Sequence, residues 1–589
     1  MTKVSKKDVG ATVHKNGVTF RVWAPFAGSV AVIGSFNNWS EMPMNAEGDG
    51  YWTVDIPGAC AGQEYKYVII NGEQKLFKND PRALELTTNA GNSVIVDTHF
   101  DWTDNDFKAP PISQQALYEL HVGTFHRIDP ATPGTFQEVK EKLDYLVDLG
   151  INMIELMPIS SMAYDRGWGY TPDYIYAIES LYGGRGAFLE LVNAAHSKGI
   201  GVIVDMVYNH FGPEGMDLWQ FDGWGQDGKG GIYFYNDWRS STPWGETRPD
   251  YGRAEVRQYI IDNVKMWLHH SHVDGLRIDS TAYIRNVYGH NDDPNNDLPD
   301  GWSILQHTTS VARKINLGAV LIAEDIGWNQ YITKPESDGG AGFSAQWEIN
   351  LPRIIRSVLG TVDDRDRHFA DLCAVLDHRY NGDAWQRVVY SDSHDSAANG
   401  GTRLDEVIAP GAATGLYARK RSLLAAALIL TMPGIPMLLQ GQEFMQSGGF
   451  NDWQALDWEN VERYPGILEA HKHLIALRKN QHNNTAGLMG QSLNILHQNE
   501  DGKVLGYHRW DKGGSGDDTV VVINFANTKY EEYIMDFPRD GKWQSRFNSS
   551  WKGYSPDFTE VDISQVDVSS SKGALRLAPY SVVILSQDQ

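Results

Sequence analysis

Four apolar segments of the sequence end in carboxylates, and three of them carry histidine or arginine beside the acids. These segments are 202–210 (VIVDMVYNH), 273–280 (VDGLRIDS), 320–325 (VLIAED) and 388–395 (VVYSDSHD). Charged side chains are costly inside a protein unless they are paired or reach solvent. The repetition therefore predicts one polar pocket shared by these segments, formed by Asp205, His210, Arg277, Asp279, Glu324, His394 and Asp395.

Two carboxylates in one pocket can cleave a glycosidic bond, one as nucleophile and the other as proton donor. Arg277 lies two residues before Asp279, so strand periodicity puts both on one face, where the guanidinium would keep this carboxylate ionised and oriented. A divalent-metal site is the alternative chemistry. Metal hydrolases favour histidine-rich ligand sets or H-E-x-x-H, which the sequence lacks. We therefore expect catalysis without a metal or cofactor.

A single aspartate at the end of a strand is most often the N-cap of the next helix. Four coincident clusters favour a shared pocket over four separate caps. Asp274 is an exception, because the two-residue periodicity turns it away from Arg277 and Asp279. We expect a structural role for Asp274.

The elements that carry these residues alternate from Leu117 onward between strand-like and helix-like segments. Such alternation implies parallel strands joined by right-handed crossovers. Eight units predict an α/β fold, a closed (β/α)8 TIM barrel, with an open doubly wound sheet as the alternative. Barrel active sites lie at the carboxyl ends of the strands, where the polar residues fall. The strand candidates lie in 117–125, 151–159, 201–209, 273–280, 319–325, 343–348, 387–395 and 435–442.

The chain outside the barrel is rich in strands at both ends. Residues 1–105 contain short alternating strands separated by turns, which predict an N-terminal β-sandwich. The barrel domain is expected over 106–490, with a linker at 107–111 near its start. Residues 491–589 return to strands and predict a C-terminal all-β domain of the sandwich type.

The amino-acid composition limits which molecules the protein is expected to bind and where it is expected to be located. The net charge of −24 argues against nucleic acid, because phosphate binders need basic patches. The sequence shows no signal peptide and no apolar stretch long enough for a membrane span. Its two cysteines, Cys60 and Cys373, match a reduced, intracellular pattern. We expect a cytoplasmic protein, monomeric or a small homo-oligomer, that contacts neither nucleic acid nor membrane.

Two motif matches are set aside. GWGQDG (223–228) fits G-x-G-x-x-G but has no strand before it and no helix after it, so we expect a loop. The run SDSHD (391–395) does not predict a Ser–His–Asp triad, because triad residues converge in space and G-x-S-x-G is absent.

The four clusters resemble the signature regions of the α-amylase superfamily, glycoside hydrolase family 13. The matching stretches are DMVYNH (205–210), GLRID (275–279), AED (323–325) and SHD (393–395), in the family's order along the barrel. GVTFRVWAP and GSFNNWS resemble the family 48 carbohydrate-binding module that precedes the barrel in glycogen-active members. The C-terminal segment is similar to their all-β domain.

The resemblance implies a role for each matching residue. Asp279 would be the nucleophile, Glu324 the general acid/base, and Asp395 a third catalytic carboxylate that holds sugar hydroxyls. Arg277 would orient Asp279. A structural calcium ion remains compatible with the family. The substrate-binding set implied by the resemblance is Tyr170, Asp205, His210, Arg277 and His394.

The resemblance also implies a retaining reaction on α-glucans, either glycogen- or starch-like polysaccharides or maltooligosaccharides. The AED and VVYSDSHD contexts are similar to 1,4-α-glucan branching enzymes, which transfer an α-1,4-glucan segment to a 6-hydroxyl. NHFGPEG (209–215) and DGLRIDS are similar to maltooligosyltrehalose trehalohydrolases. We expect branching, with α-glucan hydrolysis, including trehalose release, as the alternative and non-catalytic glycan binding as a remote one.

Two features of the expected glucan contacts stay open. Acceptor choice is expected to depend on loops 211–250, 284–303 and 445–455. In the N-terminal domain, Trp39 and Trp52 either stack on sugar rings or belong to the sandwich core.

Overall fold

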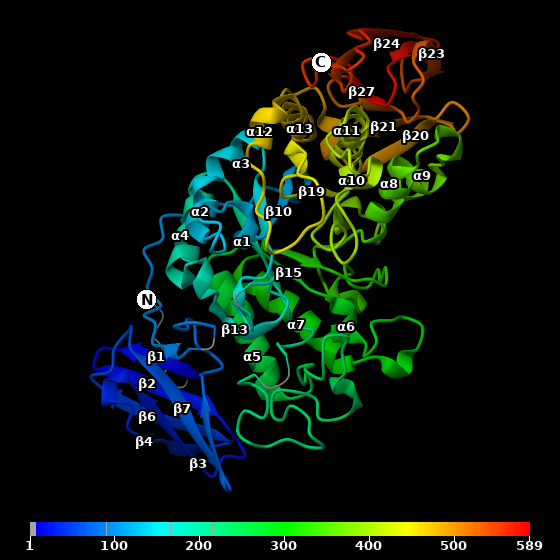
Figure 1. The fold of residues 1–589 in the computed structure, drawn as a ribbon. Coiled ribbons are helices and arrows are strands. Elements are labelled where there is room, and N and C mark those ends of the chain that lie inside the picture. Colours follow the sequence, from blue (N-terminus) through cyan, green and yellow to red (C-terminus); the bar gives the residue numbers. More distant parts are fainter. Residues whose placement is uncertain (1–7, 90, 165, 214–215, 589) are drawn as a thin grey trace.

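The computed structural model describes residues 8–89, 91–164, 166–213 and 216–588. Residues 1–7 and 90 of the expected N-terminal domain, 214–215 of the expected acceptor loop, and 589 lie outside the described residues. Figure 1 shows an elongated molecule in which an N-terminal β domain and a C-terminal β domain lie at opposite ends of a central barrel.

The expected barrel is confirmed. In the part of the chain that the structure describes, eight parallel strands close on themselves, each taken from one of the eight predicted segments. Closure is made by the first and last strands, where Leu117 is paired with Met437. The strands are β10 (Leu117–Leu120), β11 (Met153–Leu156), β14 (Gly201–Met206), β15 (Gly275–Ile278), β16 (Val320–Ala323), β17 (Ala345–Trp347), β18 (Arg387–Val389) and β19 (Ile435–Leu439).

Helices cover the outside of the barrel with their apolar faces. In α2, Thr135 accepts from the backbone N–H of Glu138, whose side chain accepts from the backbone N–H of Thr135, which fixes the start of the helix. The longer covering helices are α4 (Gly184–Ser197), α5 (Ala254–Lys265), α7 (Pro299–Ile315), α8 (Asn350–Gly360), α11 (Leu416–Thr431) and α13 (Pro465–Arg478). The shorter ones are α1 (Val122–Phe125), α2 (Phe136–Glu141), α3 (Leu143–Leu149), α6 (Thr281–Arg285), α9 (Ala370–Leu376), α10 (Leu404–Ile408) and α12 (Asn460–Arg463).

The connections at the carboxyl ends of the strands are long where they border the polar pocket. The β11–α4 connection contains an antiparallel pair, β12 (Ser160–Met162) and β13 (Pro172–Ile178). Residues 207–253 connect β14 to α5 and contain only a short 3₁₀ turn among their described residues. The GWGQDG stretch lies in this connection as a loop, as expected from its sequence.

The N-terminal domain is the expected sandwich of two antiparallel sheets. One sheet has the order β1 (Gly10–His14), β2 (Gly17–Trp23), β6 (Tyr51–Pro57), β5 (Asn45–Gly48). The other has the order β4 (Met42–Pro43), β3 (Ser29–Gly34), β7 (Glu64–Asn71), β8 (Gln74–Lys78), with β9 (Ser93–Val94) beside β7. Trp52 is half-buried and its Nε1 donates to the Ala24 carbonyl, whereas Trp39 is 41% exposed.

The N-terminal domain is bound tightly to the barrel. Arg82 pairs with Asp262 of α5 at 3.0 Å and lies over the Tyr176 ring. Phe26 stacks on Trp224 of the β14–α5 connection, with ring centroids 4.4 Å apart. The domain therefore supports one of the long connections that border the pocket.

The C-terminal domain is all-β, as expected, with more strands than the sequence indicated. Its strands form one continuous ladder in the order β20 (Ser492–Asn499), β21 (Val504–Trp510), β22 (Thr519–Asn524), β27 (Ser581–Ser586), β24 (Gly541–Asn548), β25 (Gln565–Ser569), β26 (Lys572–Leu577), β23 (Tyr530–Asp536). The ladder folds around one apolar core that includes Val520 and Trp543.

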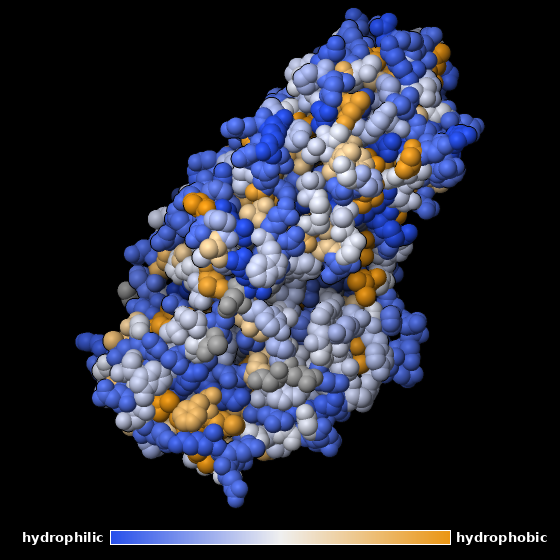
Figure 2. Space-filling model, in the orientation of Figure 1, coloured by the Kyte–Doolittle hydropathy of each residue, from blue (hydrophilic) through white to orange (hydrophobic). Residues whose placement is uncertain are grey.

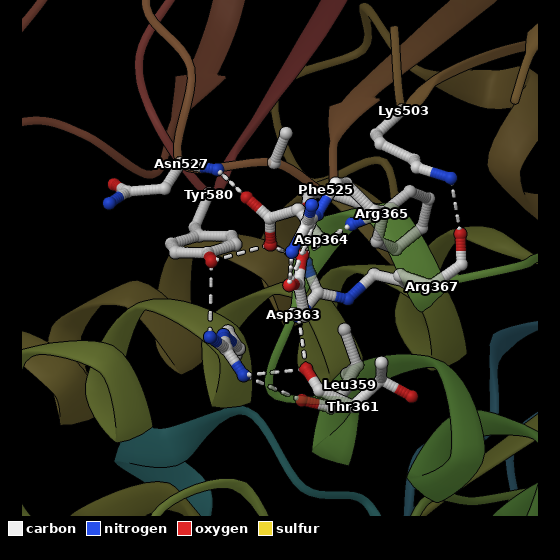
Figure 3. A network of polar contacts seen from close by, with 12 residues as sticks. Leu359, Thr361, Asp363, Asp364, Arg365, Arg367, Lys503, Phe525, Asn527 and Tyr580 are labelled. Atoms are coloured by element: carbon white, nitrogen blue, oxygen red, sulfur yellow. Dashed lines mark hydrogen bonds and ion pairs between the residues drawn. The ribbon is translucent and has the colours of Figure 1, made fainter. Parts of the chain in front are cut away.

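A polar network joins the barrel to the C-terminal domain (Figure 3). Arg367 is fully buried and donates to the carbonyls of Val358 in α8 and Phe525 after β22. Asp364 accepts from the Tyr580 hydroxyl and the Asn527 backbone N–H, both at 2.7 Å. These contacts fix the two domains relative to each other.

The face of the molecule in Figure 2 is mainly hydrophilic, with apolar side chains in small separate patches. In the described residues we find no helix with the length and apolar character required to cross a bilayer.

Candidate active site

Arg277 lies at the centre of the polar pocket. Its side chain is 1% exposed, and its Nη1 donates to Asp205 Oδ2 at 2.7 Å and to Asp279 Oδ1 at 2.8 Å. Its Nη2 donates to Glu324 Oε2 at 2.7 Å. One guanidinium thus joins carboxylates from three adjacent parts of the barrel, and its planar fork of donors suits this arrangement.

The register of the strands explains why these residues meet. β14 and β15 pair so that Asp205 is opposite Arg277. The backbone N–H of Glu324, directly after β16, donates to the carbonyl of Ile278 on β15. Parallel strands in register therefore deliver the charged residues to the same end of the barrel, as the sequence predicted.

The carboxylate of Asp279 is held by both of its oxygens. Oδ1 accepts from Arg277, and Oδ2 accepts from Asn209 Nδ2 at 2.6 Å. The next residue, Ser280, has φ +45°, a left-handed conformation that is unfavourable for a side chain of this type. In this conformation its N–H donates to Glu324 Oε2 at 3.1 Å, so the backbone also fixes the second carboxylate.

Asp279 and Glu324 reach the surface of the pocket more than Arg277 does. Their side chains are 11% and 15% exposed. Burial, together with the negative charge of Asp279, raises the pKa of Glu324 to about 7, although Arg277 opposes the shift. Burial also raises the pKa of Asp279 from its ordinary value, while Arg277 opposes it. The arrangement supplies two carboxyl groups bound to the same guanidinium, of which Glu324 has its pKa near neutral pH.

We expect a bell-shaped dependence of kcat/KM on pH that reflects this pair. Activity should rise as Asp279 ionises and fall about tenfold per pH unit above a pH of about 7, because Glu324 then loses the proton it must donate. The measurement is kcat/KM on a maltooligosaccharide from pH 4 to 9. With a glucosyl fluoride donor, whose leaving group needs no proton, the decline above pH 7 should disappear from the step that forms the intermediate. A decline of equal size with both donors would contradict the assignment to Glu324.

Tyr170 and His210 border the same pocket. The Tyr170 hydroxyl donates to Asp205 Oδ2 at 2.6 Å, and its ring stacks on the ring of His394 with centroids 5.1 Å apart. The His210 ring stacks on Trp244, and its buried Nε2 has no hydrogen-bond partner among the described residues. Burial lowers the pKa of His210 to about 4, so its ring is neutral at neutral pH. A neutral imidazole nitrogen without a partner suits a hydroxyl group of a ligand.

His394 and Asp395 enter the pocket from the end of β18. Nδ1 and the backbone N–H of His394 both contact the carboxylate of Glu119. Burial disfavours the charged form of His394, but Glu119 outweighs it and raises the pKa of the imidazole. Asp395 lies at the exposed rim, where its Oδ1 accepts from Asn399, and its charge contributes to the raised pKa of Glu324. The structure therefore brings all eight sequence-predicted residues to one pocket, with Asp395 outside the Arg277 network.

Three pocket residues were missed in the sequence. Glu119 on β10 and Glu155 on β11 lie opposite each other in register and are both buried. They carry the same signal as the predicted residues, an acid at the end of an apolar strand, in LYELHV and MIELM. Trp347 on β17 lies under Arg277, with its ring centroid 4.4 Å from Cζ, a cation–π contact. No local pattern distinguishes this tryptophan from an ordinary core residue.

Asp274 has the structural position expected of it. Its Oδ2 accepts from His196 Nε2 at 2.9 Å and from the Val202 N–H at 2.8 Å, at the other end of the barrel strands. Within the described ranges, no three Asp, Glu, His or Cys side chains are grouped as metal ligands.

Family comparisons cover almost the whole chain. The description "Alpha amylase, catalytic domain" matches residues 119–221 and 216–486. "Carbohydrate-binding module 48 (Isoamylase N-terminal domain)" matches 8–83, and "Alpha amylase, C-terminal all-beta domain" matches 495–588.

Individual relatives have low sequence identity to this chain, but they align with it over most of its length. The chain is 30% identical to a 1,4-alpha-glucan branching enzyme of Corynebacterium jeikeium, covering 92% of this chain and 77% of the relative. It is also 30% identical to a malto-oligosyltrehalose trehalohydrolase of Saccharolobus solfataricus, covering 79% of each chain. Among solved structures, a pullulanase from Anoxybacillus sp. LM18-11 complexed with maltotetraose has the same fold, with a TM-score of 0.75 at 21% identity over 100% of this chain and 88% of that one.

Proposed function

Because this chain belongs to the α-amylase family, we propose that it is a 1,4-α-glucan branching enzyme, which moves a segment of α-1,4-glucan onto a glucosyl 6-hydroxyl. One observation carries the proposal: a buried arginine holds a carboxylate nucleophile beside a carboxylic acid with a pKa of about 7, in a chain that matches branching enzymes over most of its length.

In the first step, Asp279 attacks the anomeric carbon of the donor glucan and the glycosidic C–O bond breaks. Glu324 gives its proton to the departing glycosidic oxygen, so the leaving chain ends in a neutral hydroxyl. The product is a covalent glucosyl ester of Asp279 and an ionised Glu324. In this proposal, Asp205, His210, His394 and Asp395 would hold the hydroxyls of the ring being cleaved.

In the second step, Glu324 acts as base and removes the proton of an acceptor hydroxyl. The acceptor oxygen bonds to the anomeric carbon, and the ester bond to Asp279 breaks. A glucan 6-hydroxyl as acceptor gives an α-1,6 branch, and water gives hydrolysis. The pocket chemistry is the same for both outcomes, so the acceptor must be selected by the loops around the pocket.

Exposed tryptophans in these loops supply stacking surfaces for acceptor and donor chains. Trp244 in the β14–α5 connection is 43% exposed and Trp453 after β19 is 63% exposed, and both belong to loops predicted from the sequence. Trp328 in the connection after β16 is 48% exposed and was not predicted. Flat sugar faces pack well on such rings.

The test is incubation of the full chain with amylose, followed by proton NMR of α-1,6 linkages together with an assay of reducing ends. We expect new α-1,6 signals without a matching rise in reducing ends. Because the proposed chemistry uses no metal or cofactor, the result should be the same in the presence of EDTA. Rising reducing ends without α-1,6 signals would replace branching by hydrolysis.

A trehalohydrolase is the second candidate, supported by the relative of that name that aligns over 79% of this chain. It uses the same two steps with water as acceptor. Release of trehalose from a trehalose-capped maltooligosaccharide, with no α-1,6 product from amylose, would establish this activity instead.

We further propose that the protein acts on glucans as a monomer or small homo-oligomer in the cytoplasm. The proposed location rests on its two cysteines, Cys60 and Cys373, which are unpaired in the structure. Recovery of the native chain from the culture medium or from a membrane fraction would contradict this location.

A further inference from the structure

The flank of the barrel between β16 and β17 is covered differently from its neighbours. Most barrel strands are joined through an α-helix, but residues 324–344 contain only a 3₁₀ turn, Glu336–Asp338. A helix in this crossover would pack on the strands and fill the space beside α7. Its absence from this described segment leaves room at the side of the barrel.

A cavity of about 500 Å³ occupies this position. It opens near the amino ends of the strands, since Ser344 directly precedes β17 and Gln386 directly precedes β18. The carboxylates of the active site follow their strands at the opposite end of the barrel. The volume lies in the range of sites that bind small molecules, and the cavity is separate from the catalytic pocket.

The cavity contains an aromatic wall. Trp385 lines it, and one side of the indole is supported by Arg478, whose Cζ lies 5.1 Å from the ring centroid. The backbone N–H of Trp385 donates to Asp383 Oδ1 at 2.9 Å, which fixes the start of the short turn that carries the ring. Phe343, 2% exposed, forms the apolar floor. A ligand that lies against Trp385 would therefore meet a positioned ring.

Polar groups surround this wall. Arg313 from α7, Asp383 and Gln386 offer donors and acceptors to the same space. Gly342 packs closely against Arg313, because a Cβ at this position would lie 3.2 Å from Arg313 Nη1. Its φ of +80° also favours glycine.

The charged residues that line the cavity indicate which kind of ligand it would bind. One cation, Arg313, is accompanied by two acids, Asp383 and Glu336, so an anionic ligand is not favoured. A purely apolar ligand would leave these groups without partners. A neutral molecule with flat apolar faces and many hydroxyls satisfies both the ring and the polar rim, and this is the chemistry of a saccharide.

We propose that this cavity is a secondary binding site for a short stretch of α-glucan, stacked on Trp385 and hydrogen-bonded by Arg313, Asp383 and Gln386. The choice of α-glucan over other saccharides rests on the proposed function. The site would hold a polymeric substrate at a distance from the catalytic pocket and raise its local concentration there.

The test is calorimetric titration of the full chain with maltoheptaose, in the Asp279→Asn background so that the sugar is not consumed. We expect a binding component that Trp385→Ala and Arg313→Ala each weaken about three- to tenfold. Trp551→Ala removes an exposed tryptophan from the C-terminal domain, outside the cavity, and should leave this component unchanged. If Trp385→Ala does not fold, the binding measurement on Arg313→Ala alone tests the proposed site.

Activity provides a second measurement in the otherwise native chain. Both cavity variants should keep the wild-type kcat on maltoheptaose and raise KM for amylose, because the catalytic pocket is untouched. Unchanged maltoheptaose binding in Trp385→Ala and Arg313→Ala would overturn the proposal, and equal binding of cellohexaose to the cavity would overturn its specificity for α-glucan. Failure of branching alone would leave these binding results intact, so the two proposals can be separated.

Discussion

Asp279→Asn should lower turnover of α-glucans by about 10⁴-fold or more while the protein stays folded, because the amide cannot form the covalent intermediate. Glu324→Gln should lower it by about 10²- to 10⁴-fold, the usual contribution of a general acid. Neither change should reduce stability substantially. Asp205, Asp279 and Glu324 share a single guanidinium, so a neutral amide in place of Asp279 or Glu324 removes the repulsion between that carboxyl group and the carboxylates that remain.

The measurements are kcat on amylose and on a glucosyl fluoride, with the midpoint of thermal unfolding as the test of folding. Glu324→Gln should still form the glucosyl intermediate from the fluoride, whereas Asp279→Asn should be inactive with both donors. Asp101→Asn, which changes a carboxylate 97% exposed, serves as the matched control and should behave as wild type. More than about one per cent of wild-type activity in Asp279→Asn would exclude this residue as nucleophile.

Arg277→Ala should affect both activity and stability. The guanidinium is almost completely buried and is the hydrogen-bonded partner of three carboxylates, so its loss leaves uncompensated negative charge in the pocket. We expect a loss of about 3 kcal/mol in the free energy of unfolding, the low end of the cost of breaking a buried ion pair, because the remaining carboxylates can take up protons. Activity should fall by about 10²- to 10³-fold.

Arg277→Lys distinguishes charge from geometry. A lysine keeps the positive charge but is a single ammonium on a flexible chain and cannot bridge the three carboxylates in one plane. It should recover most of the lost stability and little of the activity. Urea unfolding and kcat/KM measured on both variants provide the check. Full activity in Arg277→Lys would show that charge alone is sufficient and that the bridging geometry is not needed.

The barrel was predictable because its signals are local. Each strand contains a short run of apolar residues, such as the branched residues 202–204 or 320–322, and lies between helical segments. Alternation of such elements restricts the fold to few topologies. The predicted position of the site followed from this fold, since Asp205, Arg277 and Glu324 come at or after the ends of their strands.

The C-terminal domain shows where local signals are weak. β23 (YEEYIMD) and β24 (GKWQSRFN) alternate poorly and are rich in charge, so they were not recognised as strands. These two segments become strands because each forms hydrogen bonds with a neighbouring strand. β23 pairs with β26 and β24 with β27, both far along the chain, so that Met535 and Trp543 reach the core. Tertiary pairing here outweighs a weak propensity.

The sequence by itself determined the order of the domains, the barrel, and the types of residue in the pocket, because all of these depend on composition and periodicity along short stretches. The tertiary structure alone decided which groups touch. Glu119 and His394 are 275 residues apart and meet only because the barrel closes. The raised pKa of Glu324 and the rim position of Asp395 depend on burial and on neighbours from other strands. Local periodicity does not predict contacts between segments that are far apart in the sequence. These contacts determine the pKa values, and so the protonation states, on which the chemistry depends.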